Sequence, residues 1–138
     1  MPCPFFEPLE PLAEPAFRNV RLPLIEQYGG LCHVRPEAVH STDSCCNHGY
    51  ARGQCERFPA EAKNTAHRFS LLWQGPEELE LLFIDEQEYA PASTRQLHFS
   101  VTGNCLSEHD LDGCIAAQAL AFCRSYLRKI AWTADASQ

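Results

Sequence analysis

Five cysteines of this chain lie in stretches that fit neither a strand nor an amphipathic helix. Residues 43–59, DSCCNHGYARGQCERFP, hold three of them together with a histidine and two glycines. So few side chains remain to be buried that this stretch is expected to be a loop. Thiolates gathered from loops can ligate a metal centre, which makes metal binding the first chemistry to consider. The five are Cys3, Cys32, Cys45, Cys46 and Cys55.

An iron–sulfur cluster fits this pattern of dispersed thiols. A [4Fe-4S] cluster takes four cysteine ligands, and backbone without a Cβ leaves space close to its sulfides. Gly29 and Gly30 precede Cys32, and Gly53 precedes Cys55. The predicted cofactor is therefore a [4Fe-4S] cluster. Its predicted ligands are Cys3, Cys32, Cys46 and Cys55.

Two members of this ligand set depend on local arguments. Neighbouring side chains in a turn point in different directions, so Cys45 and Cys46 should not both face one centre. We select Cys46 because the turn at residues 47–49 would direct the chain toward Cys55. Cys3 stands on a proline-rich arm where a thiol has little reason to pack, so metal ligation is expected to anchor that arm.

Three alternatives use the same thiols differently. Zinc could bind Cys46, His48, Cys55 and Cys32, although the chain has no Cys-x-x-Cys pair of the kind common in structural zinc sites. Disulfides are a second alternative, since the cysteine count of eight is even. A thiol enzyme using Cys46, His48 and Asp43 is the third, but catalytic partners usually converge from distant segments.

The expected function follows from the cluster. A small iron–sulfur protein would act in electron transfer or redox sensing, with a redox or protein partner that the sequence does not identify. A zinc-binding structural or interaction module is the alternative. A cluster-dependent enzyme is a further one, with no substrate indicated. The only cofactors considered are therefore the [4Fe-4S] cluster and zinc.

Length and composition limit the setting in which these thiols act. The chain has 138 residues, of which 45% are hydrophobic and 21% charged, as in an ordinary single globular domain. No apolar run is long enough to cross a bilayer, so no membrane association is expected. The first fifteen residues lack a basic segment and contain five prolines, so we expect no secretory signal and a cytoplasmic location. Thiols stay reduced there.

The charge distribution argues against a nucleic-acid partner. The net charge is −7, and most of the negative charge lies in residues 76–138. A broad basic surface of the kind that binds phosphates is therefore not expected. The acidic residues between 77 and 88 could instead meet a basic partner, or they could simply be solvated.

The C-terminal half shows regular periodicity. Residues 67–75 and 78–86 are apolar, partly alternating runs joined by a Gly-Pro turn, and residues 96–101 alternate cleanly. They predict a three-stranded antiparallel sheet. Residues 107–132 predict a helix, because apolar residues recur on one half of a helical wheel. The predicted class is thus α+β, a small sheet covered by a C-terminal helix.

The helix pattern also predicts its cap and its buried face. Ser107 is the expected N-cap, Cys123 falls on the apolar half of the wheel, and Gln118 falls on the polar half. Cys105 is expected to be a bystander thiol, while Cys114 remains undecided. Four helix residues, Leu120, Phe122, Leu127 and Ile130, are predicted to pack on Leu71, Trp73, Leu81, Phe83, Leu97 and Phe99.

The N-terminal half is expected to be irregular. One domain spanning residues 1–138 is predicted, with a loop-rich metal-binding half, 1–63, and a regular half, 64–138. Six of the ten prolines fall within the first 23 residues, so this segment should run extended over another part of the protein. Gly29 and Gly30 should end any element there, and Pro36 should open a short helix over residues 36–43.

Overall fold

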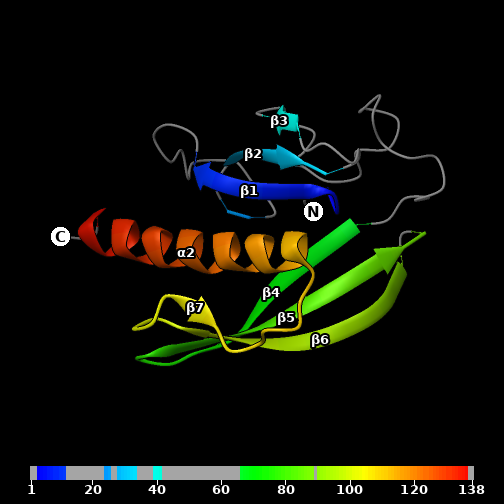
Figure 1. The fold of residues 1–138 in the computed structure, drawn as a ribbon. Helices are drawn as coiled ribbons and strands as arrows, with labels where there is room; N and C mark the ends of the chain where they lie inside the picture. Colours follow the sequence, from blue (N-terminus) through cyan, green and yellow to red (C-terminus); the bar gives the residue numbers. More distant parts are fainter. Residues whose placement is uncertain are drawn as a thin grey trace.

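The fold consists of a helix between two sheets. The computed structural model describes residues 3–11, 24–25, 28–33, 39–41, 66–88 and 90–136. These residues form two antiparallel sheets and one long helix, α2 (Gly113–Ala136). The helix lies as a central layer, with one sheet on each side (Figure 1). The predicted α+β class, with antiparallel sheets and a C-terminal helix, is confirmed.

The larger sheet comes from the regular half of the chain. Its strands are β4 (Ala66–Gln74), β5 (Glu78–Gln87), β6 (Ala90–Ser100) and β7 (Cys105–Leu106), in that order across the sheet. The sequence predicts the first three, and the structure adds β7. A turn after β6, in which Asn104 adopts a φ of 52°, reverses the chain so that β7 pairs back on β6. This sheet therefore has four strands rather than three.

A second sheet occupies the half in which loops were expected. It contains β1 (Phe6–Pro11), β2 (Tyr28–Cys32) and β3 (Val39–Ser41), with β2 in the middle. The expected extended path of the proline-rich segment is confirmed for residues 6–11, which pair with β2. The predicted helix over residues 36–43 is wrong at residues 39–41, because these pair with β2 as a strand. The tertiary pairing outweighs the local helix signal there.

Gly29 and Gly30 lie inside β2 and do not end it. The register of β1 against β2 shifts between Pro8 and Glu10, which marks a bulge beside Gly30. A Cβ on Gly30 would collide with the backbone carbonyl of Glu7. This glycine therefore allows two strands to approach closely, which is a different role from the space for a cluster inferred from the sequence.

The helix begins six residues later than predicted. Asp112, and not Ser107, caps it: the Asp112 carboxylate accepts a hydrogen bond from the backbone N–H of Cys114 at 3.0 Å. The Asp112 carbonyl accepts another from Ala116 at 2.9 Å. Ser107 instead extends the sheet, because its backbone N–H, directly after β7, donates to the His98 carbonyl of β6.

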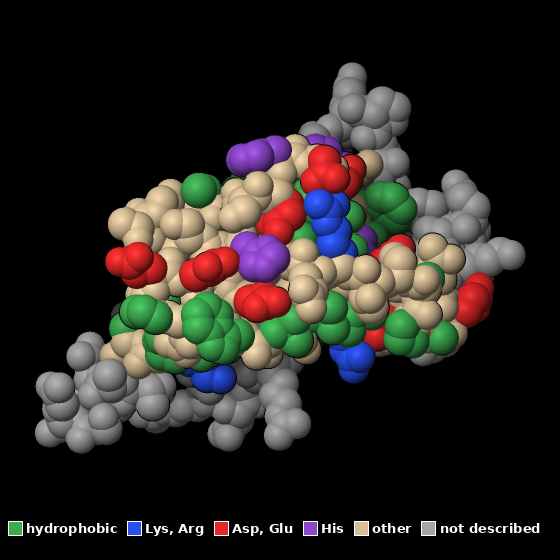
Figure 2. Space-filling model, turned by 90° about the horizontal axis from the view of Figure 1, so that it is seen from below, with side chains coloured by type: hydrophobic (Ala, Val, Ile, Leu, Met, Phe, Trp, Pro, Cys, Tyr) green, Lys and Arg blue, Asp and Glu red, His purple; other side chains and the backbone are tan. Residues whose placement is uncertain are grey.

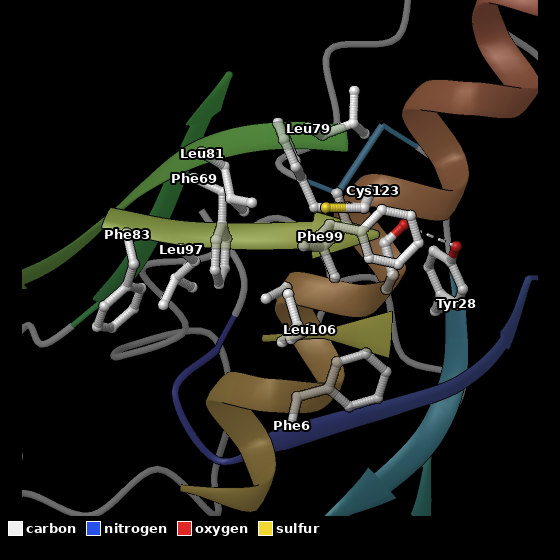
Figure 3. Packing of buried hydrophobic residues seen from close by; sticks show 14 of the residues in the cluster. Phe6, Tyr28, Phe69, Leu79, Leu81, Phe83, Leu97, Phe99, Leu106 and Cys123 are labelled. Atoms are coloured by element: carbon white, nitrogen blue, oxygen red, sulfur yellow. Dashed lines mark hydrogen bonds between the residues drawn. The ribbon is translucent and has the colours of Figure 1, made fainter. Parts of the chain in front are cut away.

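One hydrophobic core runs through the molecule and joins both sheets to α2. Half of the ten predicted residues are buried in it, namely Phe122 from the helix and Leu81, Phe83, Leu97 and Phe99 from the sheet. Figure 3 shows the four sheet residues. Leu71, Leu120 and Leu127 are half-buried and pack against the core, while Ile130 is half-buried. The core also contains residues of the N-terminal half, which are Cys3, Phe6, Leu24 and Tyr28.

Trp73 is the exception among the predicted sheet partners. Its side chain is 53% exposed. The register between β4 and β5 shifts between Leu71 and Trp73, so the strict alternation of side chains is interrupted and Trp73 pairs with Glu80. A bulge moves all later side chains to the opposite face, which places Trp73 on the outer surface. Acidic, histidine and hydrophobic side chains share that surface (Figure 2).

Gln118 differs from its predicted exposure for a related reason. The helical wheel assigns it to a solvent-facing half, but its side chain is completely buried. β1 covers this side of α2, so the helix has protein on two sides rather than one. A polar residue there must find partners within the protein, because a buried polar group without them is costly.

Candidate functional site

The structure describes two of the four predicted ligands. Cys3 and Cys32 are both buried, each with 5% of its surface exposed. Cys46 and Cys55 lie outside the described residues, as do Cys45, the spare thiol of the prediction, and the residues of the alternative thiol triad. The geometry of the complete four-cysteine set therefore stays a prediction.

Cys32 is positioned by the centre of the N-terminal sheet. It ends β2, where it pairs with Phe6 on one side and Val39 on the other. Side chains alternate along a strand, so Cys32 lies on the same face as Tyr28, four residues earlier. The Tyr28 hydroxyl donates to the Ala121 carbonyl of α2 at 3.1 Å. Cys32 therefore faces the helix layer rather than solvent.

Cys3 is held at the same end of the helix by backbone hydrogen bonds. Its carbonyl accepts from the Phe6 N–H at 3.0 Å, which closes the turn before β1. The Gln118 amide nitrogen of α2 donates to the carbonyls of Cys3 and Phe6, at 2.8 and 2.7 Å. Because Cys3 also belongs to the hydrophobic core, it has the packing role that the sequence did not indicate.

Cys114, which the sequence left undecided, lies near this pair. It is half-buried in the first turn of α2. Burial, followed by the negative charges of Asp112, Glu7 and Cys32, raises the pKa of Cys114 to about 11. Cys32 pairs with Phe6, whose carbonyl accepts from Gln118, so it lies beside the first turns of α2. The first turn of α2 therefore brings a third thiol toward the buried pair.

The described residues do not by themselves complete a metal site. Among them, no three side chains of His, Cys, Asp or Glu are placed so that they could hold a metal ion. Glu7 and His33 do form a close pair, with 2.6 Å between Oε1 and Nε2, but they are partly exposed. Glu7 follows Phe6 on β1, and His33 follows Cys32 directly after the end of β2, so this pair lies away from the face that carries Phe6 and Cys32.

The burial predicted for Cys123 is confirmed, whereas Cys105, expected in a loop, lies on a short strand. Cys123 is fully buried in the core, and this burial, opposed by the charge of Arg124, raises the pKa of its thiol to about 12. Cys105 is exposed on β7. The buried Cys123 thiol, with its raised pKa, is not in an environment typical of a reactive thiolate.

Sequence reasoning missed a buried polar network centred on Gln118. Besides holding the carbonyls of Cys3 and Phe6, its Oε1 lies 3.0 Å from Nδ1 of His67 on β4. One side chain thus connects β1, α2 and β4. The only signal in the sequence was a glutamine beside the apolar face of the helix. Such a glutamine is expected to face solvent when one sheet packs on the helix, and it is buried when a second sheet packs on the other side.

The comparisons with known proteins add no relative. No protein-family model, curated protein or solved structure matches the chain. No helix in the described part of the chain is both long and apolar enough to cross a membrane.

Proposed function

We propose that this chain is a small [4Fe-4S] protein that acts in electron transfer or redox sensing. Cys3, Cys32, Cys46 and Cys55 would hold the cluster through their thiolates. When bound, such a cluster supplies one-electron chemistry. The protein's own contribution would be to bring thiols from separate segments together and to keep water away from them.

The observation that supports this proposal most is the shared position of Cys3 and Cys32. They come from different segments of the N-terminal half, yet both are buried and both lie at the end of α2 that carries Cys114 and Gln118. Three thiols at one end of a helix make a soft, sulfur-rich environment of the kind that iron–sulfur clusters and zinc share. The absence of a Cys-x-x-Cys pair favours iron–sulfur over zinc.

Metal content of anaerobically purified protein tests the proposal. We expect brown protein with broad absorbance near about 400 nm, and about four irons and four sulfides per chain. Cys32→Ser should lose most of the iron, because a hydroxyl replaces a thiolate ligand. Cys105→Ser is the matched control, since it makes the same change at an exposed thiol outside the ligand set, and it should keep the full iron content.

The opposing outcomes are distinct. Colourless protein with one bound zinc per chain would show that the metal is zinc and that no iron–sulfur cluster is bound. Full iron content in Cys32→Ser would show that Cys32 is not a ligand. Cys3→Ser needs a parallel measurement of thermal unfolding, because Cys3 also packs in the core. Loss of iron without loss of folded structure would assign Cys3 as a ligand, whereas retained iron would leave it a core residue.

A further inference from the structure

A cavity of about 190 Å³ opens between β1 and the part of α2 from Ala117 to Arg128. Pro8 and Pro11 of β1 form one wall, and Ala117 and Ala121 of α2 form another. Proline has no backbone N–H and alanine has no polar side chain, so these walls are apolar. The volume lies below the usual range of drug-sized pockets, which is roughly 300 to 1,000 Å³, and therefore suits a small ligand.

Two arginines and a tyrosine hydroxyl supply the polar side of the cavity. Arg124 and Arg128 follow Ala117 and Ala121 on the same face of α2, and Tyr28 of β2 also lines the cavity. A guanidinium nitrogen of Arg128 donates to the Tyr28 hydroxyl at 2.7 Å. The cavity thus combines apolar walls with several hydrogen-bond donors at one end.

The positive charge of Arg124 lies in the lining of this cavity. Arg124 is held by neutral oxygens, the Asn104 side-chain amide at 2.9 Å and the Asn104 carbonyl at 3.4 Å. These bonds orient the guanidinium without neutralising its charge. A bound anion would neutralise the charge of Arg124.

We propose that this cavity binds a small oxyanion, a carboxylate or a phosphate monoester, that carries a compact apolar body. The planar guanidinium fork matches the geometry of carboxylate and phosphate oxygens. The proline and alanine walls would hold the apolar body. This site goes beyond the proposed cluster function, because its lining residues and the candidate thiols are different side chains.

Two-dimensional amide NMR titration of the 138-residue chain tests the site. Benzoate and phenyl phosphate are the two anionic probes, and benzamide, which keeps the ring but carries no charge, is the neutral control. We expect at least one anion to shift the amide signals of residues around Ala117 and Ala121 saturably, with a Kd between about 10 µM and 1 mM. Which anion binds more tightly distinguishes a carboxylate from a phosphate ligand.

Three variants assign the binding to this cavity. Arg124→Gln should weaken binding of the anion by about tenfold or more, because it removes a charged donor. Ala117→Leu should do the same by filling the cavity without changing any charge. Lys129→Gln, which removes one positive charge from the same helix outside the cavity lining, should change the Kd by less than about threefold. Thermal unfolding confirms that each variant is folded.

Each contrary result would overturn the proposal. No saturable shift with either anion up to about ten times the highest expected Kd would show that the cavity binds no small oxyanion. If benzamide bound with the same Kd as the anions, the charge of the arginines would not contribute to binding. An unchanged Kd in both Arg124→Gln and Ala117→Leu would place the binding elsewhere on the protein.

Discussion

The two faces of the β4–β7 sheet place two histidines in opposite electrostatic environments. His67 lies on the inner face, 7% exposed, and burial lowers its pKa, although hydrogen bonding to Gln118 and the charges of Asp85 and Asp112 oppose this shift. His98 lies on the outer face with 39% of its side chain exposed. A hydrogen bond to the Glu108 carboxylate raises the pKa of His98.

The outer histidine is bound by carboxylates. Glu108 Oε1 lies 2.8 Å from Nδ1 of His98, and Glu108 Oε2 accepts from the His98 backbone N–H at 3.0 Å. Burial acts to raise the pKa of Glu108, but these two hydrogen bonds outweigh it and the pKa is lowered. Glu80 adds a weaker attraction at 4.0 Å. The pKa values of two histidines on one sheet are therefore shifted in opposite directions, because their neighbours differ.

The same contrast should appear most strongly in packing. Leu81 and Leu82 are neighbours on β5, but Leu81 is fully buried in the core and Leu82 is half-buried on the outer face. We expect Leu81→Ala to lower the free energy of unfolding by about 2 to 5 kcal/mol, through lost burial and a cavity. Leu82→Ala should cost about 1 kcal/mol or less. Equal losses in denaturant unfolding would contradict the assignment of the two faces.

The next largest effect should come from the buried network. Gln118→Leu keeps the approximate size of the side chain but leaves the carbonyls of Cys3 and Phe6 without their donor. We expect a loss of about 2 to 3 kcal/mol in the free energy of unfolding, because buried groups without a hydrogen-bond partner are costly. Gln96→Leu on the exposed face is the matched control.

That control makes the same chemical change where water can replace the lost bonds, so it should cost less than about 0.5 kcal/mol. If the two glutamines proved equivalent, Gln118 would not connect the layers in solution.

A smaller effect should appear as a dependence of stability on pH. The folded-state pKa of His67 lies below its ordinary value of 6.5, so the unfolded chain binds its proton more readily. The contribution of neutral His67 is complete above pH 6.5 and is lost as the pH falls below that value. His67→Gln, which cannot titrate, should therefore lose less stability than the wild type between pH 7 and 5. An identical slope in the two proteins would show that His67 is not buried as a neutral group.

The smallest effect should come from His98 and have the opposite sign. Its folded-state pKa lies above 6.5, so its stabilisation is present below pH 6.5 and is lost as the pH rises through the raised value. The exposed position allows solvent screening, which limits the effect to less than about 1 kcal/mol. NMR titration of the imidazole signals should give a higher pKa for His98 than for His67. A higher pKa for His67 than for His98 would contradict the different environments assigned to the two faces of the sheet.

Local sequence patterns predicted the elements of the C-terminal half because those patterns have a clear period. Alternation identified the strands around Phe83 and Leu97, and the helical wheel placed Phe122 and Cys123 in the core. Patterns failed where a neighbouring segment changed the surroundings. The strand at residues 39–41 needs β2 as its partner, which the local helix signal after Pro36 could not reveal.

The candidate site was predictable only in part. The sequence indicated that loop cysteines are unusual in a chain of this composition, and it placed Cys123 and Cys105 outside the ligand set. It could not show that Cys3 packs in the core, nor that β2 places Cys32 beside the first turns of α2. The cavity beside Arg124 was also hidden, because its walls come from β1 and α2, which are more than a hundred residues apart in the sequence.

The sequence by itself determined the α+β class, the helix and the alternating strands, because periodicity and turn residues act over a few neighbouring positions. Tertiary structure decided which side of each element is covered. A second sheet on α2 buries Gln118, and a bulge in β4 exposes Trp73. Burial depends on segments far away in the chain, and burial in turn sets the hydrogen bonds and pKa values on which any function of these residues depends.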